Sequence, residues 1–277
     1  MGRVSKSTAD RVKGVILDID GVLQFQGKVY PGAVQAVRAL RNGGLILRFL
    51  SNSTLHSRRS RAERLAQMGF TLSPEEVITA SYATAEYLRA LQPRSVWLML
   101  DGAGREEFHA FVHDEEAPEY IALGDNRSRF NFDTLNKALR LLMRGAKLVA
   151  MSPELVDASL GDVELNVGAW ALMLERASGV QATYVGKPNA YMFALALATM
   201  GLAKDEVIMV GDRLSSDILG ANAFGIRSVL VKTGEYALGR TEGDARPDWV
   251  LESVADLPAL LGLGGETATA NNANPRP

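Results

Sequence analysis

The sequence predicts an α/β protein in which a second α/β domain is inserted into a doubly wound parallel-sheet core. Short apolar runs, typical of buried parallel strands, alternate with helical patterns along most of the chain. Polar motifs follow several of these runs, and the same alternation fills the long interval between the second and third motifs. The interval is too long for a simple connection, so we expect it to form a domain of its own.

Length and composition limit the function classes. The chain has 277 residues, more than most single compact domains. Its 30 Lys and Arg against 32 Asp and Glu give no indication of a nucleic acid or an anionic membrane as partner. The absence of Cys excludes disulfides, thiolate zinc sites and cysteine-nucleophile phosphatases. Residues 1–13 lack an apolar run, and no segment is apolar enough to span a bilayer, so we expect a cytoplasmic protein.

The first part of the core is expected to begin with the apolar run at residues 14–17, which ends at Asp18. Apolar residues at helical spacing and the glycines that stop them then mark the helices. The predicted order is strand 14–17, helix 32–42, strand 45–50, helix 58–68, a helical pattern from Pro74 and strand 77–78.

The inserted domain repeats the alternation and the core then resumes. The insert is predicted to hold strand 96–100, helix 105–112, strand 120–123, helix 132–144, strand 147–150 and helix 168–178. The core resumes with helix 191–200, strand 206–210, helix 217–224 and strand 228–232. We place the Rossmann-like core at 1–78 and 184–263 and the inserted domain at 79–183. The tail at 264–277 lacks apolar bulk and is expected to be disordered.

Four polar clusters fall just after predicted strands. They are Asp18-Ile19-Asp20-Gly21-Val22, Ser51-Asn52-Ser53, Gly186-Lys187-Pro188, and Gly211-Asp212 followed by Asp217. Ligands of open α/β sheets bind beyond the carboxyl ends of the strands. The four segments are therefore expected to converge on one pocket.

These residue types fit phosphoryl transfer. Asp18 and Asp20 are two apart and point to the same side of extended backbone, which costs Coulomb energy unless a cation is present. One carboxylate can attack phosphorus while the other protonates the leaving oxygen and then activates water. Asp212 would add a carboxylate to the same cation, and such oxygen ligands suit Mg²⁺. Lys187 would balance negative charge, and Ser51 with the amides after it would hold phosphate oxygens.

The ordered motifs DxDGV, SNS, GKP and GDxxxxD resemble those of the haloacid dehalogenase superfamily of hydrolases. The placement of the insert is similar to subclass IIA, the NagD-like and 4-nitrophenylphosphatase-like enzymes, in which a large α/β cap domain is inserted between the second and third motifs. Segments 130–133, 135–138 and 231–234 resemble most the branch of phospholysine phosphohistidine inorganic pyrophosphate phosphatase. The resemblance covers roughly residues 15–260.

The resemblance implies a role for each motif residue. Asp18 would be the nucleophile and a Mg²⁺ ligand, and Asp20 the acid/base, with its backbone carbonyl on the metal. Lys187 would orient the nucleophile and the phosphate, and Asp212 would bind Mg²⁺. Asp217 would lie behind these residues and hold Lys187 or a metal-bound water, although capping of the following helix is an equally good interpretation.

The substrate-binding residues implied by the resemblance are Ser51, Asn52, Ser53 and Lys187. The expected partner is a small phosphorylated substrate, and neither a nucleic acid nor a membrane is expected. Because caps of this type often dimerise in relatives, the resemblance also allows a homo-oligomer formed through the cap. The cap has Met151-Ser152-Pro153-Glu154 where relatives often have Thr-Asn-Pro-Asp, so the substrate is less well predicted than the reaction.

The predicted function is a Mg²⁺-dependent phosphatase that hydrolyses phosphomonoesters of small metabolites through an aspartyl phosphate. A phosphoanhydride or phosphoamidate hydrolase, or a phosphotransferase, would use the same residues. A phospho-accepting signalling module that does not turn over is a further alternative, but it has no use for Asp20 or for the insert. No Gly-x-Gly-x-x-Gly follows a strand and no Ser or Thr follows Lys187, which counts against dinucleotide and P-loop enzymes.

Three further groups of polar residues carry expectations. His109 and His113 are predicted to lie on a surface helix and not to form a metal pair. The basic run is predicted to be a solvated helix face; it comprises Arg58, Arg59, Arg61 and Arg64. The charged residues of the cap loops 124–129 and 152–154 are candidates for reading the leaving group; they are Asp125, Arg127, Arg129 and Glu154.

Overall fold

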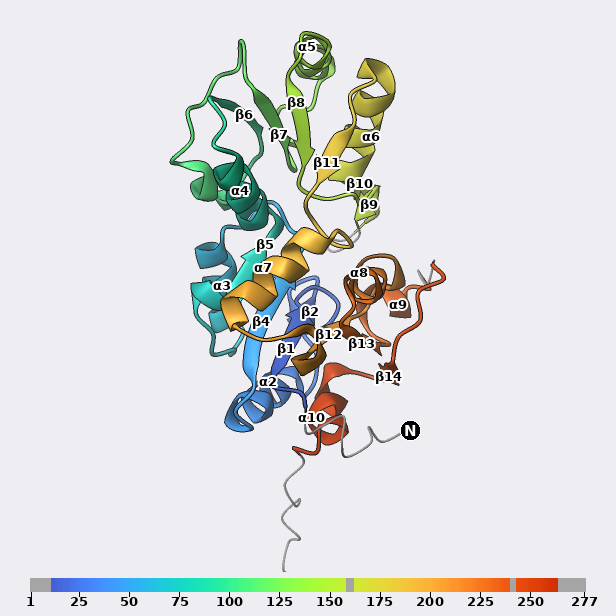
Figure 1. Ribbon diagram of the computed structural model, residues 1–277. Coiled ribbons are helices and arrows are strands. Elements are labelled where there is room, and N and C mark those ends of the chain that lie inside the picture. Colours follow the sequence, from blue (N-terminus) through green and yellow to red (C-terminus); the bar gives the residue numbers. More distant parts are fainter. Residues whose placement is uncertain (1–10, 158–161, 240–242, 264–277) are drawn as a thin grey trace, which may run out of the picture.

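The protein is built around two sheets of parallel strands, which occupy the upper and the lower part of the molecule in Figure 1. The computed structural model describes residues 11–157, 162–239 and 243–263, so the tail expected to be disordered lies outside the described residues. The larger sheet has six strands in the order β14-β13-β12-β1-β4-β5, and the smaller has four in the order β11-β8-β7-β6. Nowhere in the described ranges is there a helix with the length and apolar character needed to cross a membrane.

The six-stranded sheet is doubly wound. Its strands are β1 (Gly14–Asp18), β4 (Ile46–Ser51), β5 (Val77–Thr79), β12 (Val207–Gly211), β13 (Arg227–Val231) and β14 (Trp249–Leu251). Its helices are α2 (Ala33–Asn42), α3 (Arg58–Gln67), α4 (Ala80–Leu91), α7 (Ala190–Met200), α8 (Leu219–Phe224), α9 (Gly234–Ala237) and α10 (Leu257–Leu260). The chain runs outward from β1 in both directions, because β1 pairs in parallel with β4 on one side and with β12 on the other. This order confirms the predicted fold class.

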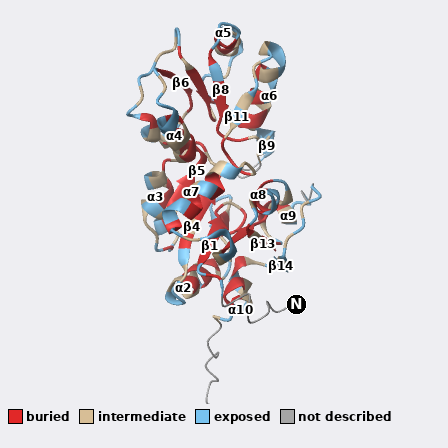
Figure 2. Cartoon of the chain, in the orientation of Figure 1, coloured by how far each residue is buried: buried red, intermediate tan, exposed pale blue. Residues whose placement is uncertain are grey.

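Alternation along β1 explains how helices cover both faces of this sheet. Val15 and Leu17 belong to an apolar cluster with residues of α2, α3 and α10, whereas Ile16 belongs to a cluster with α4, α7 and α8. Successive side chains of a strand point to opposite faces, so a strand covered on both sides must be apolar throughout. All five residues of β1 are accordingly buried, as are those of its neighbour β12, and β1 is red in Figure 2.

The four-stranded sheet is also covered on both faces. It consists of β6 (Val96–Met99), β7 (Tyr120–Leu123), β8 (Lys147–Ala150) and β11 (Ala182–Tyr184). Val96 and Leu98 pack in the cluster that contains α4, while Trp97 and Met99 pack with α5 (Phe132–Met143) and α6 (Val167–Ser178). Because α4 contributes to one cluster with residues of both sheets, it joins the inserted unit to the core (Figure 1).

Several elements differ from the prediction. The predicted α-helix at 105–112 is wrong, because the structure has only a 3₁₀ helix, Ala103–Phe108, which ends at Phe108. Val112 is exposed, and its carbonyl accepts a 2.8 Å hydrogen bond from the Val96 N–H. His109 and His113 are therefore exposed, as expected, but do not share a helix. Helix 217–224 begins as a π-helical turn, Leu214–Ile218, before α8.

Other elements were not predicted at all. They are α4, α9, α10, β11, β14, and the short hairpins β2 (Gln24–Phe25) with β3 (Lys28–Val29) and β9 (Val156–Asp157) with β10 (Glu164–Leu165). The buried face of α4 consists largely of Ala, Ser and Thr, so its apolar pattern is weak in the sequence. The short strands give too few residues for a periodic pattern.

Candidate active site

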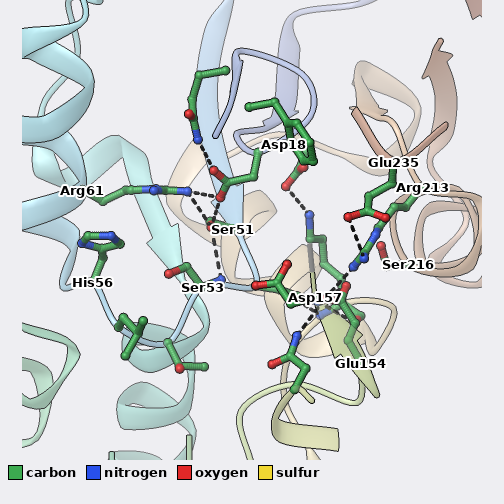
Figure 3. Close-up of a pocket in the computed structure, with 18 of the residues that line it drawn as sticks. Asp18, Ser51, Ser53, His56, Arg61, Glu154, Asp157, Arg213, Ser216 and Glu235 are labelled. Atoms are coloured by element: carbon green, nitrogen blue, oxygen red, sulfur yellow. Dashed lines mark hydrogen bonds and ion pairs between the residues drawn. The ribbon is translucent and has the colours of Figure 1, made fainter. Parts of the chain in front are cut away.

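The predicted motifs meet in a pocket of about 270 Å³ between the core and the inserted unit (Figure 3). Asp18 ends β1 and Ser51 ends β4, so both lie at the carboxyl edge of the six-stranded sheet. Lys187 arrives at the same pocket from the other sheet, shortly after β11. The lining includes most of the predicted site residues, namely Asp18, Asp20, Ser51, Asn52, Ser53, Lys187 and Asp217.

Lys187 lies between two carboxylates. Its Nζ is 2.5 Å from Asp18 Oδ1 and 2.6 Å from Asp217 Oδ1, and all three residues are buried. Burial opposes the charge on Lys187, but attraction by Asp18 and Asp217 outweighs it and raises the pKa of the ammonium. Burial raises the pKa of Asp18 against the attraction of Lys187. The arrangement holds one oxygen of Asp18 in place and would gain from another cation.

Asp212 supplies the observation that points to such a cation. Oxygens of Asp18, Asp212 and Asp217 lie within 4.8 Å of one another. Asp212 Oδ2 accepts a 2.7 Å hydrogen bond from the Glu235 N–H, whereas its buried Oδ1 has no hydrogen-bond partner among the described residues. Burial and then the charges of Asp18 and Asp217 raise the pKa of Asp212. An unpartnered buried carboxylate oxygen fits a divalent cation with oxygen ligands.

Gly21 is needed for this cluster to form. Its φ is +95°, and a Cβ at this position would lie 2.1 Å from Asp212 Oδ2. The turn after Asp20 therefore requires glycine both for its conformation and for the close approach of Asp212.

The Ser51-Asn52-Ser53 motif is held by hydrogen bonds. Ser51 Oγ accepts from the Ser53 N–H at 3.2 Å. The side chain of Asn52 binds the backbone of the third motif. Its Oδ1 accepts from the Lys187 N–H at 2.9 Å, and its Nδ2 donates to the Lys187 carbonyl at 3.0 Å. A contact from Asn52 to a substrate would thus come from its backbone, because its side-chain amide already joins the second and third motifs.

The basic run on α3 differs from the prediction. Arg61 is buried, and its Nη2 contacts Asp20 Oδ2 and lies 3.4 Å from Ser51 Oγ. Arg64 also lines the pocket, so only part of the run is a solvated face. Arg61 precedes the buried Leu65 by four residues and hence shares its helix face, which was the available sequence signal.

His56, beside Arg61 and Arg64, completes this side of the pocket. Burial and then the two guanidinium groups lower the pKa of His56 to about 4, so the imidazole is neutral near pH 7.

Arg213 links the inserted unit to the core and was also missed. Its guanidinium lies 2.7 Å from Glu154 Oε2 and 3.4 Å from Glu235 Oε1. Burial opposes its charge, but Glu154 and Glu235 outweigh this and raise its pKa. Asn52 Nδ2 donates to the other oxygen of Glu154 at 3.0 Å, so one carboxylate that follows the smaller sheet contacts two segments that follow strands of the larger sheet.

The four charged residues expected to read the leaving group are divided by the structure. Asp125 and Glu154 line the pocket. Arg127 pairs with Asp125 at 2.8 Å and Glu164 at 2.5 Å, and Arg129 pairs with Glu115 at 3.1 Å; neither belongs to the lining.

Comparisons with known proteins identify the family of this chain. Residues 15–112 match a family model described as haloacid dehalogenase-like hydrolase, and residues 184–257 match a HAD-hydrolase-like model. Phospholysine phosphohistidine inorganic pyrophosphate phosphatase of Danio rerio is 34% identical over 81% of this chain and 84% of its own. Ribonucleotide monophosphatase NagD of Escherichia coli is 30% identical over 90% of this chain and 99% of its own.

A solved structure extends the similarity to the whole fold. The p-nitrophenyl phosphatase from Archaeoglobus fulgidus superposes with a TM-score of 0.82 at 30% identity, over 89% of this chain and 98% of that one. Sequence, fold and the converging carboxylates agree, and the chain belongs to the haloacid dehalogenase superfamily, as a phosphatase of the subclass IIA type.

Proposed function

We propose that the protein is a Mg²⁺-dependent phosphatase of small phosphorylated metabolites that acts through an aspartyl phosphate on Asp18. The observation that carries this proposal is the geometry around Asp18. Its Oδ1 is held by Lys187 at 2.5 Å, and Asp20 follows two residues later in the same pocket. A carboxylate fixed at one oxygen keeps the other for attack, and a second carboxyl group nearby supplies the proton transfers.

The reaction has two steps. An oxygen of Asp18 attacks phosphorus and the bond from phosphorus to the leaving oxygen breaks, while Asp20 gives its proton to that oxygen. Water then attacks the aspartyl phosphate, Asp20 takes the proton of the water, and the bond between phosphorus and Asp18 breaks. Inorganic phosphate is released and both carboxyl groups return to their starting states.

Other residues bind the phosphate and the cation. Ser51 Oγ and the backbone N–H groups of Asn52 and Ser53 would bind phosphate oxygens, with Lys187 between phosphate and nucleophile. Asp18, Asp212 and the backbone carbonyl of Asp20 would hold Mg²⁺. The bound ion would offset the negative charge of the carboxylates and the phosphate. Asp217, 2.6 Å from Lys187, would keep that ammonium in place.

The inserted unit would select the substrate. We propose residues 79–183 as the cap and residues 1–78 and 184–263 as the core. The cap contributes Asp125, Glu154 and Asn166 to the pocket lining, while Asp18 comes from the core. Small phosphates fit a cavity of about 270 Å³, whereas a folded phosphoprotein does not.

The test is phosphate release from a panel of phosphorylated metabolites in Mg²⁺, with phosphoanhydrides and phosphoamidates included to separate the alternative reactions. Wild type should turn over repeatedly, and Asp18→Asn should lose activity because an amide cannot replace the attacking carboxylate. Acid quenching during turnover should trap phosphate on the wild-type protein only. Near-normal release by pure Asp18→Asn would contradict the mechanism, and labelling without turnover would support the signalling alternative.

A further inference from the structure

We propose that Arg61 is a positioning residue that, together with Gln24, holds the Asp20 carboxyl group where it can exchange protons with the leaving oxygen and with water. This inference rests on the proposed function, in which Asp20 is the acid/base. It adds two residues that belong to none of the four motifs.

The contacts of Asp20 carry the proposal. Its Oδ2 accepts from Arg61 Nη2 and from Ser51 Oγ, the latter at 3.3 Å, and its Oδ1 accepts from Gln24 Nε2. Both oxygens are therefore held, and by donors from different elements, since Arg61 lies on α3 and Gln24 on β2. Lys187 contacts Asp18 and Asp217, so it does not set the orientation of Asp20.

Stability does not explain an arginine at position 61. Its side chain is 5% exposed, the adjacent Ala62 and Leu65 pack in an apolar cluster, and its buried Nε has no hydrogen-bond partner among the described residues. Burying a guanidinium with an unpaired N–H is unfavourable, and an apolar side chain of similar volume is often as stable or more so. The contacts that Arg61 gains in return are those to Asp20 and Ser51.

Asp20 needs such support. Its side chain is 24% exposed, so a change of rotamer could turn the carboxyl group toward water. Proton transfer requires oxygens within hydrogen-bond reach, and a misplacement of about 1 Å can cost roughly 10²-fold in rate. A planar guanidinium on a helix and an amide on a hairpin restrict this rotation from two sides.

A positioning role predicts a dependence on the leaving group. An alkyl alkoxide is a poor leaving group and must be protonated by Asp20 as the bond to phosphorus breaks. A dinitrophenolate leaves as a stable anion and needs no proton. The ratio kcat/KM covers the steps through that bond cleavage, so losing Arg61 should affect alkyl phosphates selectively.

The experiment compares Arg61→Met with wild type on a simple alkyl phosphate and on 2,4-dinitrophenyl phosphate. We expect kcat/KM to fall about 10²-fold for the alkyl ester and less than about threefold for the dinitrophenyl ester. A burst of dinitrophenolate should appear, because water attack on the aspartyl phosphate still requires Asp20. The melting temperature should not fall.

Three further variants make the test decisive. Gln24→Met removes the other donor and should shift the ratio in the same direction, which keeps the test valid if Arg61→Met folds poorly. Arg59→Met removes an exposed cation from the same helix and should change neither ester. Asp20→Asn is the benchmark and should show the largest selectivity.

The outcomes separate the inference from the proposed function. If Asp20→Asn shows selectivity and both Arg61→Met and Gln24→Met do not, the positioning role is wrong. Equal losses on both esters with weakened inhibition by inorganic phosphate would instead make Arg61 a phosphate ligand. If Asp20→Asn itself shows no selectivity, the assignment of Asp20, and hence the proposed mechanism, fails first.

Discussion

Two residues of this site, Asp212 and His56, have pKa values that are shifted by burial and by neighbouring charges. Asp212 Oδ1 is buried and lacks a hydrogen-bond partner among the described residues, and two other carboxylates are close to it. His56 is neutral because burial and two guanidinium groups lower its pKa to about 4. Each state makes a prediction that can be measured without a substrate.

Asp212→Asn should abolish the stabilisation of the folded protein by Mg²⁺. An ion that binds only the folded state stabilises it by about 2.7 kcal/mol at a hundred times its Kd. We expect the melting temperature of wild type to rise with Mg²⁺ and that of Asp212→Asn to stay constant. Glu63→Gln, which removes an exposed carboxylate on α3, is the control and should respond like wild type. An equal rise in Asp212→Asn would place the ion elsewhere.

His56→Gln should make stability less sensitive to acid. The pKa of His56 is about 4 in the folded state and about 6.5 when unfolded, so the unfolded state binds the proton first. Wild type should therefore lose stability relative to His56→Gln as the pH falls from 6.5 to 4, with no change in the difference above 7. Urea unfolding of both proteins across this range is the measurement. A constant difference would show that the imidazole is not held neutral.

At the scale of elements, α3 is the helix that gives the pocket its basic side. It begins after Ser57, whose Oγ accepts a 3.1 Å hydrogen bond from the Ser60 N–H, and it carries Arg61 one turn later. The same helix face continues to Ala62 and Leu65 in the apolar cluster of the core. The position of the Arg61 guanidinium thus depends on where α3 starts and on how it packs.

Ser57→Ala should lower the free energy of unfolding by about 1 kcal/mol, because it leaves a backbone N–H of the first turn without its acceptor. Ser57→Thr keeps an oxygen at that position and should retain most of the stability. Urea denaturation gives both values. Equal stability of Ser57→Ala and wild type would mean that packing alone fixes the start of α3.

On the scale of the whole molecule, the pocket is completed by contacts between the inserted unit and the core. Glu154 follows β8 of the smaller sheet and contacts Arg213 and Asn52, which follow strands of the larger one. The carboxylates proposed as catalytic come from the proposed core, so changes in the proposed cap should alter the choice of substrate more than the reaction.

Glu154→Ala should reduce kcat/KM for the best metabolite more than for a small aryl phosphate, because the cap carboxylate is expected to contact the larger leaving group. Arg129→Ala is the matched control: it removes a cap residue that pairs with Glu115 outside the pocket lining and should change neither value. Equal losses on both substrates would limit Glu154 to joining cap and core.

Much of this architecture is determined by local patterns in the sequence. The apolar run that ends at Asp18, the alternation of strands and helices, and the order of the four motifs predict the fold class, which depends on which side chains can be buried. Residues at strand ends could be assigned to one site, because parallel strands place their carboxyl ends at one edge. The prediction of a helix at 105–112 was wrong, because apolar spacing alone does not show whether a segment packs against the rest of the protein.

Only the tertiary structure decided which charges are buried and what they contact. Arg61 looks like its neighbours Arg58 and Arg59 in the sequence, but α3 places it against Asp20, which lies 41 residues earlier. Asn52 was expected to bind phosphate, and only the structure shows that its side-chain amide holds the backbone of Lys187, 135 residues away. The pairing of a buried charge depends on the approach of distant segments, and no local periodicity records that approach.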